Sequence, residues 1–252
     1  MIELANISKR YDSGHLAVAG IGLEVDRHEI VAVIGPSGCG KSTILRLIAG
    51  LEEPTTGSVK VDGHHVRGPG RSTGIVFQQP RLMPWLTVTR NVGFGLDQTA
   101  DHSRETSEVI ERVGLTPFAS ALPRELSGGM AQRVAIARAL VTKPPVLLMD
   151  EPFSSLDAFT RIDLQAHLLE VWDWYRPTTL LVTHDIDEAL ILADRVVVLG
   201  GTPGAIQADI TVDLRRPRSR TDSAFHRLQD LSMQQLGRSR TETGMKEMPA
   251  AT

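Results

Sequence analysis

The segment that most constrains this chain is GPSGCGKST, residues 35–43, which lies between two apolar segments. The run before it, 30–34, predicts a buried strand, and the apolar spacing of 44–48 predicts a helix that ends near Gly50. Strand, loop and helix in this order are the context in which G-x-x-x-x-G-K-[ST] forms a phosphate-binding loop. Its glycines let successive backbone N–H groups point at phosphate oxygens, and the helix adds the positive end of its dipole. The sequence therefore predicts a nucleotide site on an α/β fold.

Side chains within this P-loop have different expected roles. Lys41 is expected to bridge the β- and γ-phosphates, and the Ser42 hydroxyl is expected to bind Mg²⁺. Cys39 is interpreted as a small loop residue without a chemical role. The nucleotide-binding residues predicted here are Gly35, Pro36, Ser37, Gly38, Cys39, Gly40, Lys41, Ser42 and Thr43.

A second strand, 146–149, is predicted to end in a pair of carboxylates. A P-loop needs an acidic partner on a neighbouring strand to hold the water shell of the metal, and Asp150 is the candidate. Glu151 follows at the carboxyl end of the strand, where it is expected to orient or deprotonate the water that attacks the γ-phosphate. Such a pair alone is more often solvated surface, and the P-loop in the same chain favours the functional interpretation.

Composition argues against several classes of protein. The 252 residues are 41% hydrophobic, which suffices for a buried core. A single cysteine precludes an internal disulfide and fits a reducing compartment. Apolar runs are far shorter than the roughly 18 residues that span a bilayer, and the N-terminal residues lack the apolar stretch of a signal peptide. A net charge of −3 argues against a broad nucleic-acid-binding surface, so no nucleic acid partner is expected.

Strands and helices alternate along most of the chain, which predicts a mostly parallel sheet covered by helices on both faces. Residues 79–141 differ, because prolines flank Trp85 and an amphipathic helical pattern over 101–113 stops at Gly114. We therefore expect a helical subdomain inserted between strands, within a domain that covers 1–214.

The C-terminal segment, 215–252, is polar and basic. It predicts a linker, a helix at 224–236 and a disordered tail. Four arginines near its start are interpreted as a solvated linker rather than as a contact for lipid headgroups or RNA. They are Arg215, Arg216, Arg218 and Arg220.

LSGGMAQRVAIARAL, residues 126–140, resembles the signature motif of ATP-binding cassette (ABC) ATPases. Ser127 can N-cap the helix that begins there, and Gly128 and Gly129 allow backbone N–H groups to approach a phosphate. In the family this motif contacts ATP held by the P-loop of the other subunit, so two subunits pack head to tail around two ATPs. An ordinary capped helix fits the same residues. Met130 replaces the usual glutamine, which puts in doubt only a side-chain contact to the partner's nucleotide.

The family's other motifs follow in order over roughly residues 2–214. The resemblance implies that Tyr11 stacks on adenine, although a surface tyrosine on a strand is the competing interpretation. Gln78 resembles the Q-loop glutamine, which reaches the metal and the attacking water, and Gln79 is the neighbouring alternative. Asp157 resembles the D-loop residue at the dimer interface, and His184 resembles the switch histidine that contacts the γ-phosphate.

The resemblance implies the ABC ATPase architecture: an α/β P-loop core with a mostly parallel sheet, an N-terminal antiparallel β region and an inserted α-helical subdomain. It also implies an ATP-hydrolysing subunit with ATP and Mg²⁺ as cofactors, which works as a homodimer or with a paralogous cassette. A single cassette without membrane segments is typical of importers, whose partners are membrane permease subunits and a periplasmic or surface substrate-binding protein. The expected location is therefore peripheral, at the cytoplasmic face of the inner membrane.

The segments 81–88, 183–190 and 212–218 resemble importers of nitrate, sulfonates and taurine. An exporter subunit and a soluble ABC ATPase acting on nucleic acid or ribosomes are the alternatives, and the signature motif opposes an ordinary P-loop kinase or GTPase. Leu82, Met83 and Trp85 could form an apolar surface that receives a permease helix. Packing of Trp85 inside the helical subdomain is the competing interpretation.

Overall fold

Strand β3 (Ile30–Ile34), which precedes the P-loop, is buried along its whole length. It pairs in parallel with β8 (Thr178–Thr183) and with β9 (Arg195–Gly200). Strand β10 (Ala205–Thr211) pairs antiparallel with β9. Parallel strands that are buried on both faces have continuous apolar sequences, which is why β3 and β8 could be located from the sequence.

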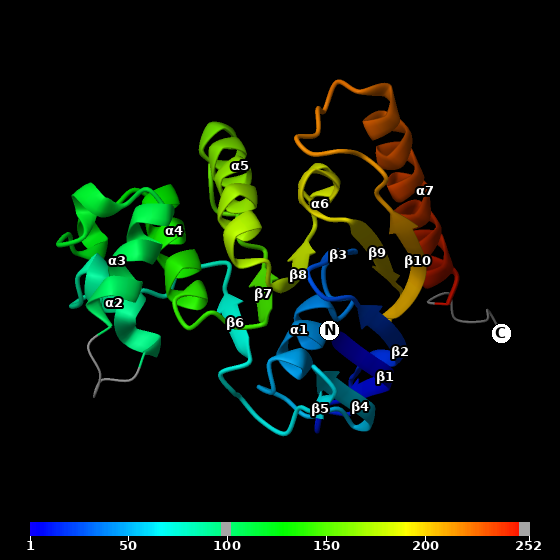
Figure 1. Ribbon diagram of the computed structural model, residues 1–252. Coiled ribbons are helices and arrows are strands. Elements are labelled where there is room, and N and C mark those ends of the chain that lie inside the picture. Colours follow the sequence, from blue (N-terminus) through cyan, green and yellow to red (C-terminus); the bar gives the residue numbers. More distant parts are fainter. Residues whose placement is uncertain (97–101, 247–252) are drawn as a thin grey trace. The chain divides into compact units, whose positions relative to one another are not determined.

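The computed structural model describes residues 1–96 and 102–246, and the chain forms two compact units (Figure 1). The first unit comprises Met1–Gly70 and the chain from Thr178 onward, and the second comprises Arg71–Pro177. The helices predicted within 79–141 all belong to the second unit, which also includes the strands and the helix that flank them.

The N-terminal β region of the first unit is antiparallel, as predicted. Its strand order is β2 (Leu16–Val25), β1 (Ile2–Arg10), β4 (Thr56–Val61) and β5 (His64–His65). Between β4 and β5 the chain turns at Asp62 and Gly63, whose φ angles are 49° and 78°. Positive φ at both central residues is the requirement of the type I′ hairpin turn, which an Asp-Gly pair meets well.

Helices of the first unit follow its buried strands. Helix α1 (Lys41–Ile48) follows β3, and Gly50 beyond its end has a φ of 69°, as expected for a residue that stops a helix. Helix α6 (Ile186–Leu192) follows β8 and packs on β3. Helix α7 (Ser223–Lys246) packs on α6, β9 and β10.

The second unit contains one parallel pair of strands, β6 (Thr73–Val76) and β7 (Val146–Asp150). Together with the parallel pairs of β3, this confirms a mostly parallel α/β fold. Its helical elements are α2 (Val88–Val92), η1 (Gly93–Gly95), α3 (Ser103–Arg112), η2 (Thr116–Phe118), η3 (Pro123–Glu125), α4 (Gly128–Leu140) and α5 (Ala158–Tyr175).

Three expectations differ from the structure. Trp85 is 72% exposed, so of the two interpretations left open for it, packing inside the helical subdomain is wrong. The prediction of a solvated linker is wrong for Arg218, whose side chain is 2% exposed because backbone carbonyl groups surround its guanidinium. Helix α7 continues to Lys246, past the predicted end at 236, since no proline interrupts the chain between 217 and 249 and a formed helix extends at low cost. The remainder of the predicted disordered tail and residue 101 of the predicted helix lie outside the described residues.

Candidate nucleotide site

The P-loop curls tightly between β3 and α1. Gly38 and Gly40 have φ angles of 83° and 91°, a region that glycine adopts without steric cost. A Cβ added at Gly35 would lie 2.5 Å from the carbonyl oxygen of Leu199, so the loop leaves β3 in close contact with β9. These glycines therefore serve the backbone path that the P-loop pattern predicts.

Lys41 is the first residue of α1, and its side chain folds back over the loop. Its Nζ donates to the carbonyl oxygens of Gly35 at 2.8 Å and Pro36 at 2.9 Å, and the residue is only 6% exposed. Neighbouring Cys39 is also buried, and this burial raises the pKa of its thiol, which keeps it protonated and inert. The loop thus holds one buried cation and no thiolate.

Tyr11 lies beside α1. Its hydroxyl donates to Glu52 Oε2 at 2.9 Å and lies 3.3 Å from Thr43 Oγ1. Its ring stacks on that of His15, with a centroid separation of 6.5 Å and an interplanar angle of 10°. The sequence pointed to Tyr11 and Thr43, and the structure brings the two together, whereas His15 had no motif to mark it.

His184 leaves the sheet of the first unit at the same edge as the P-loop. Strand β3 pairs with β8 in the register Ile34 to Thr183, so Gly35 and His184 both come directly after paired residues. His184 is exposed. Ligands of open α/β sheets bind at the carboxyl ends of the strands, which is where the P-loop and His184 both lie.

The second unit brings Gln78, Asp150 and Glu151 to a common edge in the same way. Strands β6 and β7 are parallel with Val76 opposite Met149, so the chain beyond each strand starts at the same level. Glu151 has a φ of 46°, an uncommon conformation for a residue with a side chain. Uncommon backbone angles of this kind cluster at functional sites.

Ser127 caps α4, as predicted. Its Oγ accepts a hydrogen bond from the backbone N–H of Met130 at 3.2 Å, and both Ser127 and Gly128 are exposed at the helix start. Gly129 has a second, structural reason to lack a side chain, because its Cβ would lie 2.5 Å from Thr160 Cγ2. The glycine pair therefore permits close packing of α4 on the start of α5 as well as backbone access.

Asp157 caps α5. Its carboxylate accepts the Thr160 hydroxyl at 2.6 Å and the backbone N–H groups of Phe159 and Thr160 at 3.1 and 3.0 Å. These hydrogen bonds, that of the Thr160 hydroxyl first, hold the pKa of Asp157 below its usual range. Asp157 is therefore an ionised, fixed acceptor at this turn.

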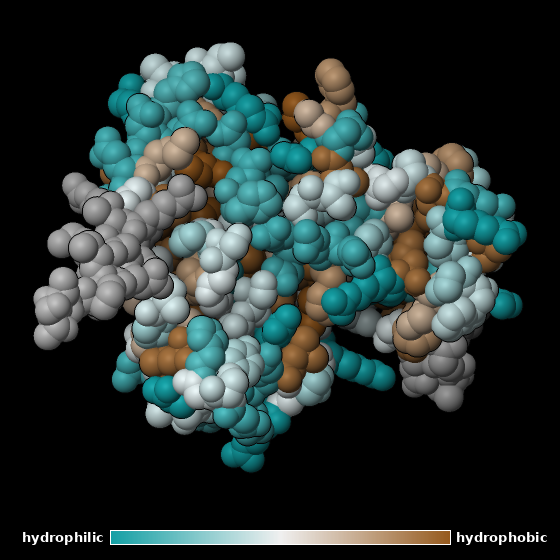
Figure 2. Space-filling model, turned by 180° about the vertical axis from the view of Figure 1, so that it is seen from behind, coloured by the Kyte–Doolittle hydropathy of each residue, from teal (hydrophilic) through white to brown (hydrophobic). Residues whose placement is uncertain are grey.

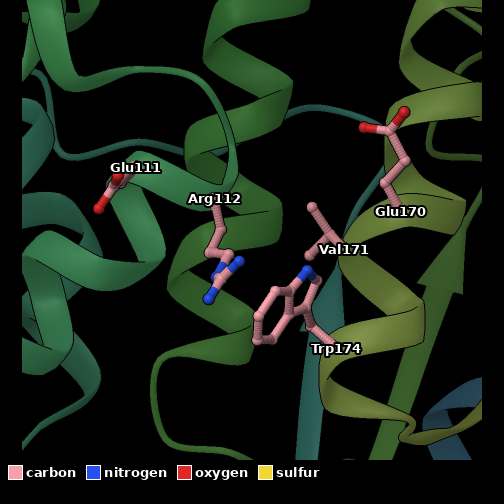
Figure 3. Close-up of a pocket in the computed structure, with 5 residues that line it drawn as sticks. All are labelled: Glu111, Arg112, Glu170, Val171 and Trp174. Carbon is pink, nitrogen blue, oxygen red and sulfur yellow. The ribbon is translucent and has the colours of Figure 1, made fainter.

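The predicted residues fall into two sets, one in each unit. Tyr11, the P-loop and His184 belong to the first unit, and the other predicted residues belong to the second. A hollow of about 360 Å³ in the second unit contains none of them; Arg112 there stacks on Trp174, with its guanidinium carbon 3.1 Å from the ring centroid (Figure 3). Nothing about this hollow matches the chemistry of the predicted site.

Gly204, between β9 and β10, supports the P-loop although no motif marks it. Its backbone N–H donates to Ala17 O at 2.9 Å, and its carbonyl accepts from Ala19 N at 3.0 Å. A Cβ at this position would lie 1.9 Å from the carbonyl oxygen of Cys39. Only the folded structure places this turn against the loop.

Replacement of Gly204 with alanine is expected to displace the P-loop backbone at Cys39. Because overpacking against backbone atoms is not relieved by a rotamer change, we expect a loss of about 1 to 3 kcal/mol in the free energy of unfolding. ATP affinity should fall with it, as measured by denaturant unfolding and nucleotide titration. Gly22→Ala is the matched control, since a Cβ there meets nothing within 4 Å. Equal stability of the two variants would contradict the proposed support.

Comparisons with known proteins agree on one family. Residues 18–154 match the model of a family described as ABC transporter. An aliphatic sulfonates import ATP-binding protein of Pseudomonas syringae pv. tomato is 50% identical over 91% of this chain and 96% of its own. An uncharacterized ABC transporter ATP-binding protein of Methanocaldococcus jannaschii is 52% identical over 89% of this chain and 86% of its own. A solved dimeric ATP-binding cassette in a post-hydrolysis state with ADP and Pi has 32% identity and a TM-score of 0.74, covering 85% of this chain and 100% of that one.

Proposed function

Because this chain belongs to the ABC transporter family and is an ATPase whose hydrolysis is coupled to transport, we propose that it drives the import of alkanesulfonates. The observation that carries the proposal is the near full-length relative at 50% identity that is named for aliphatic sulfonate import. Taurine and nitrate are the other cargoes that the sequence segments of this chain suggest. Within the described residues, no helix is long and apolar enough to cross a bilayer. From the import role for which that relative is named, we propose that the chain works as a peripheral subunit on the cytoplasmic face of the membrane, with permease subunits and a substrate-binding protein as partners.

We propose a head-to-tail dimer, of two copies or of this chain and a paralogous cassette, in which the P-loop of one subunit and the signature helix of the other enclose ATP. The exposed start of α4 supports this, because Ser127 Oγ and the amide groups of Gly128 and Gly129 lie at the positive end of a 13-residue helix. The solved cassette that is dimeric with ADP and Pi bound supports formation of a dimer. Met130 at the position after the two glycines contributes its backbone N–H to the Ser127 cap.

Oxygen donors fit the expected Mg²⁺. Ser42 supplies a hydroxyl, Gln78 an amide oxygen and Asp150 a carboxylate, which are the hard ligands that this ion takes beside substrate phosphates and water. Bound there, the ion would neutralise charge on the phosphates.

Protein groups would carry the remaining chemistry. Lys41 binds the β- and γ-phosphates, and Glu151 orients the attacking water and accepts its proton. His184 contacts the γ-phosphate at the edge of the first unit. Tyr11 provides an aromatic face for adenine, and Asp157 fixes the turn that leads into α5 at the dimer contact.

The permease is proposed to contact the segment that contains Leu82, Met83 and Trp85. Trp85 is 72% exposed, and apolar side chains at a surface often mark contacts. Figure 2 shows hydrophobic residues reaching one face of the molecule in small groups among hydrophilic ones. The segment is held rigidly by buried Asn91, whose amide nitrogen donates to the carbonyl oxygens of Met83 and Leu86 and whose oxygen accepts from Met83 N.

Growth of a strain that lacks this gene tests the proposed cargo. We expect it to fail on alkanesulfonates as sole sulfur source and to grow on sulfate, with growth restored by the wild-type gene but not by the Lys41→Ala variant. Taurine as sulfur source and nitrate as nitrogen source distinguish the other cargoes. Growth on alkanesulfonates equal to that of the parent, with a defect confined to taurine or nitrate, would replace the proposed cargo.

A further inference from the structure

Helix α6 begins two residues after His184, and its N-cap, Asp185, directly follows the histidine, so the position of α6 determines where His184 lies. Asp185 caps its start by accepting from Glu188 N at 3.1 Å. The last carbonyl groups of any helix have no partner inside the helix and need donors from elsewhere. In this chain those donors come from the segment that joins β10 to α7, which passes beside α6 in Figure 1.

Arg218 supplies most of these donors. Its Nη1 donates to the carbonyl oxygens of Leu190 at 2.6 Å and of Ala193, both at the C-terminal end of α6. Its Nε donates to Leu214 O at 3.0 Å and its Nη2 to Val212 O at 3.4 Å, which ties the helix end to the chain after β10. Burial lowers the pKa of Arg218 to about 10, so the guanidinium is charged at neutral pH and suits the negative end of a helix.

Arg216 completes the contact at this end. Its Nη2 donates to the carbonyl oxygen of Leu192 and lies 2.8 Å from Asp194 Oδ1. Asp194 in turn accepts from the backbone N–H of Ile30 at 3.0 Å through Oδ2, and its own N–H donates to Ile30 O at 2.7 Å. The end of α6 is thereby fixed to the start of β3, the strand that leads into the P-loop.

The start of α6 is held by α7 and by the segment that precedes it. Gln229 of α7 donates to Asp187 Oδ1 at 2.6 Å, and Arg220 Nε lies 3.9 Å from Asp187 Oδ2. Asp187 is in the first turn of α6, three residues after His184. Residues after β10 therefore contact both ends of α6 through hydrogen bonds and ion pairs.

We propose that Arg218, with Arg216 and Gln229, is a positioning residue for His184, which it holds in place through α6. The proposal rests on the proposed role of His184 in ATP hydrolysis. A helix of two turns that is fixed at both ends and joined to β3 leaves little freedom to His184, the residue before its N-cap. A histidine placed in this way meets the γ-phosphate in one geometry, whereas a loose α6 would misplace it.

Arg218→Met in the full chain tests this role, because it removes all the guanidinium donors while keeping a side chain that fills the site. We expect kcat for ATP hydrolysis to fall about 10- to 100-fold, the range that small misplacements of a reacting group produce. The KM for ATP and the affinity for a non-hydrolysable analogue should stay within about twofold, since ground-state binding does not depend on this geometry. Hydrogen exchange should become faster in α6 but not in β3 or β8.

Two further variants separate positioning from folding. Arg218→Lys should retain part of the rate, because one ammonium keeps the charge but cannot reach four carbonyl groups. Arg215→Met, in the same segment and exposed, should behave as wild type. If Arg218→Met does not fold, Gln229→Leu is used in its place, and we expect it to show the same kinetic pattern with a smaller fall in kcat.

Several results would overturn the proposal. One is an unchanged kcat in Arg218→Met, or in Gln229→Leu where that variant replaces it. Another is a loss of kcat in Arg215→Met equal to that in Arg218→Met. The third is a fall in the ATP affinity of Arg218→Met that matches the fall in its kcat. If the wild-type chain does not hydrolyse ATP, the proposed function itself fails. If the wild type hydrolyses ATP and the Arg218 variants do so equally well, only the positioning role fails.

Discussion

Replacement of Lys41 with alanine will reduce ATP hydrolysis by about 10²- to 10³-fold or more, the cost of removing a preorganised charge from a reacting phosphate. Lys41 is the buried cation of the loop, and its Nζ already lies between two loop carbonyl oxygens. A small rotation of its flexible stem would carry the ammonium to the phosphates, and alanine has nothing to replace it. A phosphate-release assay measures the loss of hydrolysis, and titration with a fluorescent nucleotide measures the loss of ATP binding.

Lys60→Ala is the control for this variant. Lys60 lies on β4 and pairs with Glu3 at 3.3 Å, so its loss removes one lysine charge away from the loop. We expect its hydrolysis rate to equal that of wild type, and circular dichroism should show both variants folded. A Lys41→Ala variant that hydrolyses ATP at the wild-type rate would rule out the assigned role of the P-loop in phosphate binding.

The sequence was sufficient for elements whose residues carry their own signal. Strands β3, β7 and β8 are buried on both faces and appear as apolar runs, and Gly50 and Gly114 mark helix ends because their positive φ favours glycine. The P-loop was equally accessible, since its spacing and its neighbouring elements together define it. Local physics thus predicted these elements and the P-loop, whereas Tyr11, Gln78, Asp157 and His184 were identified by the resemblance to ABC ATPases.

Contacts between distant segments were not accessible in this way. Arg218 resembles the exposed Arg215 in sequence, and its buried position depends on carbonyl groups from Leu190 and Ala193, which no pattern near it reveals. In sequence, Gly204 does not differ from any other turn glycine, and only the folded structure places it against Cys39. Trp85 was ambiguous because exposure depends on how the helices of the second unit pack. These residues are specified by tertiary structure alone.

Replacement of Glu151 with glutamine will trap an ATP-bound dimer. Glutamine matches the size of glutamate and keeps an oxygen that can accept a hydrogen bond from water, but it cannot take the proton, so hydrolysis should fall about 10²- to 10⁴-fold. The change also removes one negative charge beside Asp150, which favours a bound triphosphate. Size-exclusion chromatography with light scattering, with ATP and Mg²⁺ in the buffer, should show a dimer where wild type is mainly monomeric.

The double variant Glu151→Gln with Ser127→Arg separates the shared site from other causes of association. Ser127 is exposed at the start of α4, so a bulky arginine there should block the partner's nucleotide without disturbing the P-loop. We expect it to bind ATP and to remain monomeric. If the single variant stays monomeric, or if the double variant dimerises as well as the single one, the signature helix does not close over the partner's ATP. Hydrolysis and dimer separation are coupled only when the P-loop of one subunit and the signature helix of the other enclose the same ATP. The Glu151→Gln variant, with and without Ser127→Arg, therefore tests that coupling directly.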